Sequence, residues 1–233
     1  MTPNKIIEKS EVKKYFNGTG FERWNKIYSK SDEINTVQKN IRKGHQKTVD
    51  DVLSYIRNYP ELTKKSFCDA GCGVGRLSIP LLRLGIKQIQ VSDISSEMIK
   101  ETKKRINELG LKQGKIKYEV CDLEQLQGLF VVVVCLDVFI HYPQPVAEEM
   151  VQHLCDLSKE KLIVSFAPYT PVLAVLKNIG KLFPGSSKTT RAYTLKEKGI
   201  INAAKARGFN VVKTKLNQAP FYFSKLIEFE KNK

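Results

Sequence analysis

The sequence lacks a long apolar segment. No run of 18 uncharged apolar residues, the shortest stretch that reads as a membrane-spanning helix, occurs in its 233 residues. Residues 1–5 contain no apolar signal core and lack the acid-free, Arg- and Ser-rich pattern of a transit peptide. We therefore expect no membrane-spanning segment and a targeting peptide that is absent or already removed.

The chain is also poor in cysteine and has no CxxC pair. Its five cysteines are an odd number, and Cys121 and Cys135 lie in or beside apolar, strand-like segments. This pattern favours reduced thiols in a cytosol-like compartment. We expect no metal site at Cys68 and Cys72 and no protein-bound metal.

Charge is unevenly distributed along the chain. Lys and Arg outnumber Asp and Glu by 14 to 8 in residues 1–65 and by 15 to 4 in residues 159–233. In residues 66–158 the acids prevail by 12 to 10, so the net charge of +15 belongs to two basic flanks. Such flanks suit an anionic substrate, an acidic membrane surface or nucleic acid, or they form an ordinary lysine-rich solvated surface.

Residues 1–65 contain helical patterns and no strand pattern. Apolar residues recur at three- and four-residue spacing, with His45 on the apolar face of the longest helix, and Pro60 follows that helix. We divide the chain into a helical N-terminal arm or cap over 1–60 and a cofactor-binding domain over 61–233, with an insert at about 169–195. The helices predicted before Pro60 span 6–16, 21–28 and 33–58.

From Ser66 onward, strand and helix patterns alternate, as in a parallel βαβ sheet. The last two strands are separated by only four residues, too few for a crossover helix, so they form an antiparallel pair. This arrangement predicts a class I methyltransferase Rossmann-like α/β fold with a seven-stranded, mostly parallel sheet and an antiparallel C-terminal hairpin. The predicted strands are 66–70, 88–93, 115–120, 130–136, 161–166, 209–216 and 221–229; the helices are 76–84, 95–109, 147–157, 170–182 and 196–207.

A glycine-rich turn follows the first predicted strand. Asp69 precedes Gly71 and Gly73, which let the backbone bend tightly and approach a ligand closely. Asp93 ends the next strand, about twenty residues on, where a carboxylate can accept hydrogen bonds from both ribose hydroxyls. An acid at Asp69 is unfavourable beside a pyrophosphate but suits the amino group of a methionine. The turn therefore predicts S-adenosylmethionine rather than a dinucleotide.

Further candidate cofactor contacts follow strands two to four. Asp122 follows the third strand, where its side chain could accept a hydrogen bond from the adenine amino group. We expect Ile94, Met98 and Leu123 to sandwich the adenine ring, and we place Leu136, at the end of strand four, in the same site.

Motifs in the arm at 15–24 and 27–28, after strand four at 140–144 and in the last strand at 221–224 form one wider pattern. This pattern resembles one family, the magnesium-protoporphyrin IX O-methyltransferases of chlorophyll biosynthesis. Two positions depart from that family: Val131 stands where an aspartate is usual, and Arg76 where a small residue is common. We expect these departures to affect stability and cofactor affinity more than chemistry. The motifs that carry the resemblance span nearly the whole chain: 15–24, 27–28, 69–73, 135–138, 140–144, 165–168, 183–185, 191–193 and 221–224.

The resemblance implies methylation of one propionate carboxylate of Mg-protoporphyrin IX. A propionate has a pKa near ~4.3 and is ionised at neutral pH, so it needs placement and exclusion of water rather than a strong base. A neutral donor can orient it with little loss of nucleophilicity. We predict that His141, after strand four, fills this role, and that Tyr28, at the end of the arm, is a second catalytic residue. We expect His45 to belong to the core, and Trp24 and Phe21 to pack the arm.

Other functions stay open at this point. A quinone-type O-methyltransferase would share the cofactor site, whereas strand four lacks the Pro-Pro-aromatic ending of adenine-amino methylating enzymes, so we expect no nucleic acid partner. A porphyrin carrier or a partner of a magnesium chelatase subunit is a further alternative. The resemblance implies a location in the cytoplasm or plastid stroma, with peripheral contact to the thylakoid membrane, and magnesium that is carried by the substrate.

Overall fold

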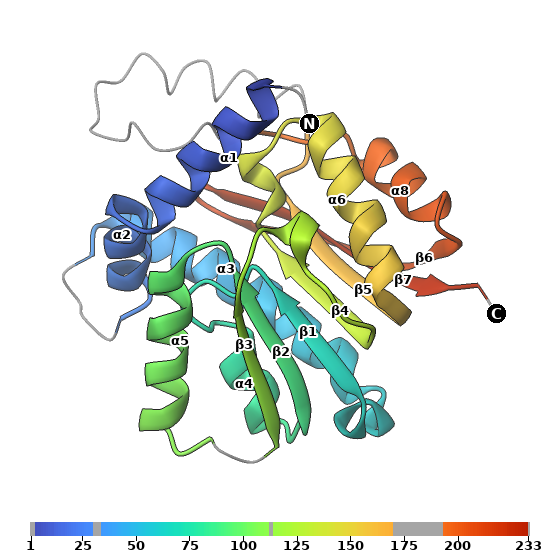
Figure 1. The fold of residues 1–233 in the computed structure, drawn as a ribbon, viewed down its shortest axis with the longest axis horizontal. Coiled ribbons are helices and arrows are strands. Elements are labelled where there is room, and N and C mark those ends of the chain that lie inside the picture. Colours follow the sequence, from blue (N-terminus) through green and yellow to red (C-terminus); the bar gives the residue numbers. More distant parts are fainter. Residues whose placement is uncertain (1–2, 30–33, 112–113, 170–192, 233) are drawn as a thin grey trace.

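The computed structural model describes residues 3–29, 34–111, 114–169 and 193–232. Its centre is a seven-stranded sheet in the order β3-β2-β1-β4-β5-β7-β6, in which β1 to β5 are parallel and β7 is antiparallel to both of its neighbours (Figure 1). The predicted fold class is therefore confirmed. The strands are β1 (Ser66–Ala70), β2 (Gln88–Asp93), β3 (Lys115–Val120), β4 (Phe130–Leu136), β5 (Ser158–Phe166), β6 (Phe209–Ala219) and β7 (Tyr222–Lys231).

Helices cover both faces of this sheet (Figure 1). One core joins α3, α4 and α5 to the sheet through side chains such as Val52, Leu81 and Ile106, and the other joins α6 and α8 through Met150 and Ile200. The α-helices are α1 (Pro3–Phe16), α2 (Thr19–Ile27), α3 (Thr36–Arg57), α4 (Ser78–Arg83), α5 (Ser96–Glu108), α6 (Gln144–Leu157) and α8 (Glu197–Lys205); the short 3-10 helices are η1 (Pro60–Lys64), η2 (Leu123–Gln125) and η3 (Phe139–His141).

The centre of the sheet matches the sequence pattern most closely. Every residue of β4 is buried, because parallel strands covered by helices on both faces read as continuous apolar runs. The observed bounds of β1 to β4 are those predicted. The β4–β5 pairing is irregular between Phe130 and Val132, and the backbone N–H of Val131 there donates to Ser66 Oγ at 3.1 Å.

Elements at the edges differ from the prediction by a few residues. Asn35 and Gln38 form a reciprocal cap, so α3 begins at Thr36 rather than 33. The helix predicted from 147 begins at Gln144, and the strand predicted from 161 begins at Ser158. The helix predicted over 170–182, and most of the insert over 169–195, lie outside the described residues.

The C-terminal hairpin is longer and its turn tighter than predicted. The two strands pair from Phe209 with Lys231 to Ala219 with Tyr222, leaving only Pro220 and Phe221 in the turn. Phe221 has φ 65°, a conformation that is uncommon outside glycine. The hairpin brings Tyr222 against α3, where it reaches the carboxyl end of β4.

Candidate active site

The turn after β1 has the geometry that its glycines predict. Gly71, Gly73 and Gly75 have φ of 83°, 53° and 81°. A Cβ on Gly71 would meet Val138 Cγ2 at 2.2 Å, whereas a Cβ on Gly73 would meet nothing within 4 Å. Gly71 therefore allows close packing of the protein on itself, and Gly73 leaves open space in which a ligand can approach the backbone. This cradle fits the predicted methyl donor.

Asp93 ties this turn to the end of β2. Its Oδ2 accepts from the backbone N–H of Gly73, and its Oδ1 accepts from that of Ser95, both at 2.9 Å. Burial raises the pKa of Asp93 to about 6, while the backbone donors oppose the rise. Each carboxylate oxygen retains acceptor capacity, so Asp93 can hold the turn and still receive ribose hydroxyls.

Asp69 is held on the other side of the turn. Its side chain is 2% exposed and accepts a hydrogen bond of 2.5 Å from Ser78 Oγ at the start of α4. Burial raises its pKa to about 7. The carboxyl therefore connects β1 to α4. Its predicted contact with the amino group of the methionine part of the methyl donor stays a prediction.

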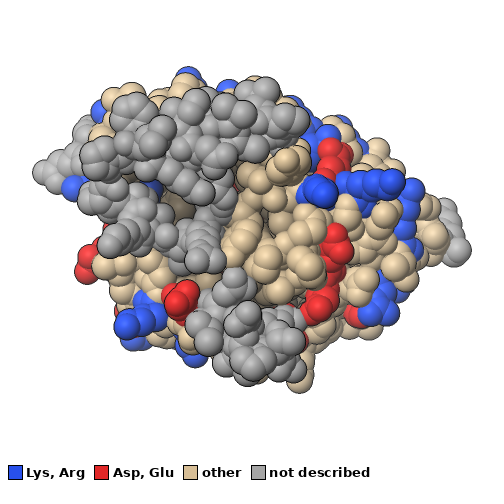
Figure 2. Space-filling view, turned by 90° about the horizontal axis from the view of Figure 1, so that it is seen from above, with Lys and Arg blue, Asp and Glu red and all other residues tan. Residues whose placement is uncertain are grey.

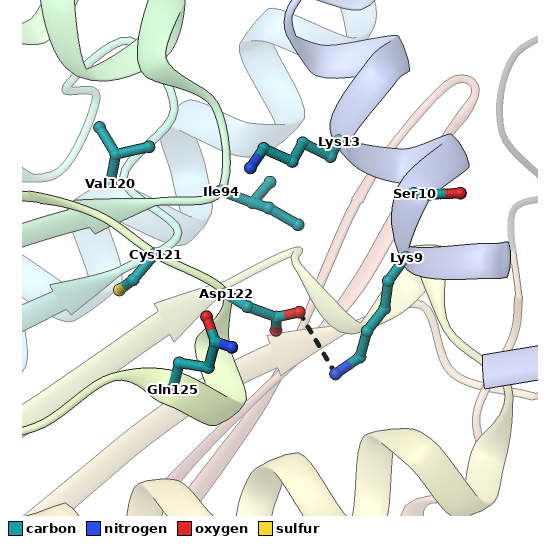
Figure 3. Close-up of a pocket in the computed structure, with 8 residues that line it drawn as sticks. All are labelled: Lys9, Ser10, Lys13, Ile94, Val120, Cys121, Asp122 and Gln125. Atoms are coloured by element: carbon teal, nitrogen blue, oxygen red, sulfur yellow. Dashed lines mark ion pairs between the residues drawn. The ribbon is translucent and has the colours of Figure 1, made fainter. Parts of the chain in front are cut away.

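A cavity of about 200 Å³ lies where the adenine was predicted (Figure 3). Ile94 and Asp122 line it from the sheet, and Lys9 and Lys13 line it from α1. Lys9 Nζ lies 3.2 Å from Asp122 Oδ2 and also pairs with Glu124, so the N-terminal helix closes this end of the site. Sequence reasoning missed Lys9, because nothing in the pattern of α1 distinguishes it from the other lysines.

Three other predicted cofactor residues are core residues in this structure. Met98 is 2% exposed, and Leu123 and Leu136 are each 8% exposed. None of them is among the residues that line the cavity. Their contacts with a bound cofactor therefore stay predictions.

His141 lies at the carboxyl edge of the sheet, on η3 directly after β4. Its ring meets Phe16 of α1 edge-on, with centroids 4.9 Å apart and planes at 80°. Burial lowers the pKa of His141 to about 4, partly offset by the Asp137 carboxylate. The imidazole is therefore neutral at pH 7. It can donate or accept a hydrogen bond without carrying charge.

Tyr28 follows α2 and lies in a cluster of rings. It stacks on Trp24 with centroids 5.7 Å apart, and the ring of His45 on α3 is 5.4 Å away. The guanidinium carbon of Arg76 lies 5.0 Å from the Tyr28 centroid. Burial, together with the Asp137 carboxylate, raises the pKa of Tyr28, so its hydroxyl keeps its proton.

Asp137 links these two candidate catalytic residues, because its charge acts on both. It has φ 56°, and its carboxylate accepts hydrogen bonds from Ser165, Tyr222 and Ser224 at 2.6–2.7 Å. Three hydroxyl donors fix this charge beside the site. Its place directly after the apolar strand 130–136, like that of Asp93 after β2, is the signal that could have identified it.

The described residues contain no group of three or more His, Cys, Asp or Glu side chains placed to hold a metal ion. Within the same residues, no helix is long and apolar enough to cross a bilayer.

Known proteins similar to this chain include porphyrin methyltransferases. The family model described as magnesium-protoporphyrin IX methyltransferase C-terminus matches residues 135–231, and a general methyltransferase domain matches 67–161. The magnesium-protoporphyrin O-methyltransferase of Synechocystis is 45% identical over 98% of each chain. This chain belongs to the magnesium-protoporphyrin IX methyltransferase family.

Other similarities agree with this family. The chloroplastic magnesium protoporphyrin IX methyltransferase of Arabidopsis thaliana is 47% identical over 95% of this chain and 70% of its own. The crystal structure of the Synechocystis PCC 6803 enzyme with bound S-adenosylhomocysteine superposes with a TM-score of 0.88, at 43% identity over 96% of this chain and all of that one. A ubiquinone biosynthesis O-methyltransferase of Saccharomyces cerevisiae is 31% identical over 50% of this chain and 35% of its own.

Proposed function

We propose that this protein transfers the methyl group of S-adenosylmethionine to one propionate carboxylate of Mg-protoporphyrin IX. The products are the monomethyl ester and S-adenosylhomocysteine. The observation that carries this proposal is the extent of the similarity. Relatives named for this porphyrin match 95–98% of the chain, through the arm and the C-terminal region, whereas quinone-type relatives match 50–60% of it. The arm contributes Tyr28, Trp24 and Phe16 to the site.

The chemistry requires placement more than proton transfer. The bound donor supplies an electrophilic methyl carbon on a sulfonium sulfur; a carboxylate oxygen bonds to that carbon, and the carbon–sulfur electron pair stays on sulfur. No proton leaves the nucleophile, because a propionate is ionised at neutral pH. Orientation in line with the methyl group is worth up to roughly 7–11 kcal/mol.

His141 and Tyr28 can supply this orientation as neutral donors. The pKa of His141 is lowered to about 4 and that of Tyr28 is raised, so neither group carries charge at pH 7. A neutral imidazole or phenol can hold one carboxylate oxygen without withdrawing as much charge from it as a guanidinium would. Asp137 is held in place by its three hydroxyl donors. Its negative charge favours the protonated form of the Tyr28 phenol and opposes a build-up of positive charge at the place of methyl transfer.

The chain divides by role in the same proposal. Residues 61–233 hold the methyl donor, and residues 1–60 act as an arm or cap whose α1 and α2 close the site. The second half of α3 packs against the sheet instead, through Val49, Val52 and Ile56. In this proposal, α1 and α2 are the part of the arm that closes over the site.

Partners and location follow from the basic flanks. In Figure 2, the largest continuous group of Lys and Arg side chains lies at the right of the view, next to Asp and Glu side chains, and smaller groups lie at the left. This surface suits peripheral contact with acidic lipid at the thylakoid membrane, from the stroma or cytoplasm, and contact with a magnesium chelatase subunit. The relative from Arabidopsis thaliana, named as chloroplastic, supports a plastid or cytoplasmic location.

Mass analysis of the pigment tests the proposed reaction. The protein is incubated with Mg-protoporphyrin IX and S-adenosylmethionine that carries a labelled methyl group. We expect one labelled methyl ester per porphyrin. A parallel incubation with a catechol-type quinone precursor covers the alternative substrate. Labelled catechol with unchanged porphyrin would replace the proposal by a quinone-type enzyme.

A further inference from the structure

Arg76 and His45 carry buried nitrogens that nothing in the described part of the chain satisfies. Arg76 Nε and His45 Nδ1 are both buried and have no hydrogen-bond partner there. A buried polar atom without a partner costs about 1–3 kcal/mol, so natural proteins satisfy nearly all of them. Both atoms belong to side chains that contact one ring, that of Tyr28, and together they call for a ligand.

The charge of Arg76 is also unbalanced. Its guanidinium donates to Gln46, a neutral amide, and lies over the face of Tyr28. No carboxylate lies within ion-pair distance of it in the part of the chain that the structure describes. Burial lowers the pKa of Arg76, and the nearby cations Arg42 and Arg105 act in the same direction. Tyr28 and the Asp50 carboxylate, which is beyond ion-pair distance, oppose this shift. Arginine nevertheless stays protonated, so the site holds a permanent, partly desolvated cation.

The surroundings of the Arg76 guanidinium indicate which chemical class of ligand it would bind. Arg76 directly follows Gly75 and the open space beside Gly73, where a ligand can approach the turn. His45 reaches the same ring from α3, one residue after Gly44, whose missing Cβ leaves room for Tyr222. A guanidinium and an imidazole N–H match the two oxygens of one carboxylate.

We propose that Arg76 and His45 form a carboxylate-binding subsite beside Tyr28. The carboxylate belongs either to the methionine end of the methyl donor or to the second, non-reacting propionate of the porphyrin. The reacting propionate does not fit, because a guanidinium on its oxygen would withdraw the charge that attacks the methyl group. The porphyrin source rests on the proposed function, whereas the methyl-donor source does not.

Calorimetry distinguishes the two sources. The probes for the first are S-adenosylhomocysteine and its decarboxylated analogue, titrated into the wild type, Arg76→Gln, His45→Gln and the exposed control Arg83→Gln. If the subsite holds the donor carboxylate, Arg76→Gln weakens S-adenosylhomocysteine binding about tenfold or more and His45→Gln by a smaller factor. The analogue, which lacks the carboxylate, then binds all four proteins alike.

Fluorescence tests the porphyrin source. Trp24 is the only tryptophan of the chain and stacks on Tyr28, so quenching of its emission reports porphyrin binding at this place. The probes are the monomethyl and dimethyl esters of Mg-protoporphyrin IX, added with S-adenosylhomocysteine present. If the subsite holds the second propionate, the wild type prefers the monomethyl ester and Arg76→Gln loses that preference. Because only binding is measured, this result is independent of whether methyl transfer occurs.

A stability measurement separates binding from a purely structural role. Removing an unpaired buried cation relieves a desolvation cost, so the melting temperature of ligand-free Arg76→Gln should not fall below that of the wild type. Arg76→Lys keeps the positive charge but loses the planar guanidinium with its paired N–H donors. It provides a second folded variant, for which we expect intermediate affinity. Carboxylate-dependent binding that stays within twofold of wild type in Arg76→Gln and His45→Gln, for both kinds of ligand, would overturn the subsite.

Discussion

The two sides of the cleft satisfy their polar groups in different ways. On the cofactor side, the groups at the ends of β1 and β2 bond to each other: Asp93 accepts from Gly73 and Ser95, and Ser92 accepts from the N–H groups of Gly71 and Cys72. On the arm side, Tyr28 is held by ring contacts, and the nitrogens of His45 and Arg76 beside it have no partner among the described residues.

The hydrogen bonds of the cofactor side are therefore formed before any ligand binds, whereas those of the arm side need a ligand. Backbone hydrogen bonds between neighbouring strand ends need no ligand, so the cofactor side is preorganised and binding costs little ordering. On the arm side, Arg76 Nε and His45 Nδ1 have no hydrogen-bond partner among the described residues before binding. A bound carboxylate would supply that partner and stabilise the arm side. We expect substitutions of His141 and Tyr28 to change catalysis. Substitutions of Asp93, Arg76 and His45 should change affinity.

The largest effect is expected at His141. His141→Ala should reduce the single-turnover rate about 100-fold, the size of loss that misplacing a reactant by an ångström can cause. His141→Gln should retain more activity, because it keeps a neutral donor. The pKa of His141 is lowered to about 4, so the wild-type rate should show no histidine limb between pH 5.5 and 9.

Rates measured across that pH range with both ligands saturating provide the check. His153→Gln is the matched control, since His153 lies on α6 and its Nε2 hydrogen-bonds to the Leu126 carbonyl oxygen at 3.0 Å. Equal loss in His141→Ala and His141→Gln, with a limb in wild type alone, would show that His141 is a general base.

A smaller effect, on affinity, is expected at Asp93. Asp93→Ala should weaken S-adenosylhomocysteine binding by about 1.5–3 kcal/mol, because a charged acceptor is lost and Gly73 loses its partner. The pKa of Asp93 is raised to about 6, so the wild-type affinity should fall as the pH drops below that value and the acceptor is protonated. Calorimetry at pH 5 and pH 8 measures both effects. An affinity that is independent of pH and of the substitution would remove Asp93 from the ribose site.

The smallest effect is expected at Lys9, which joins the two sides by reaching from α1 to Asp122. This ion pair is worth about 1 kcal/mol or less, so Lys9→Gln should change S-adenosylhomocysteine affinity by about fivefold or less. It should nevertheless increase hydrogen exchange in α1. Lys14→Gln, on the same helix, exposed and outside the cavity, is the control. Unchanged exchange in Lys9→Gln would show that ring contacts such as Phe16 with His141 hold the arm without the ion pair.

The sequence predicted the centre of the fold better than its edges. The strands β1 to β4 have the predicted bounds, because buried parallel strands are uniform apolar runs with clear ends. The hairpin strands were predicted too short, since Asn217 and Ala219 continue a pairing that depends on the partner strand rather than on local apolar pattern.

The same contrast holds within the site. Gly71, Gly73, Asp93 and Asp122 were predicted from spacing alone, and the structure brings them to one edge of the sheet. His45 was assigned to the core because it lies on an apolar helix face. The structure places that face against Tyr28 and Arg76, which no periodicity within α3 can reveal.

The sequence by itself determined the cofactor side of this protein, because consecutive parallel strands must end at the same edge and so carry their terminal acids and glycines together. Only the tertiary structure decided the arm side. Trp24, Tyr28, His45 and Arg76 come from three separate segments, and their meeting depends on how α1, α2 and α3 pack around the strand ends. Chain connectivity dictates the first arrangement, whereas side-chain packing between distant segments dictates the second.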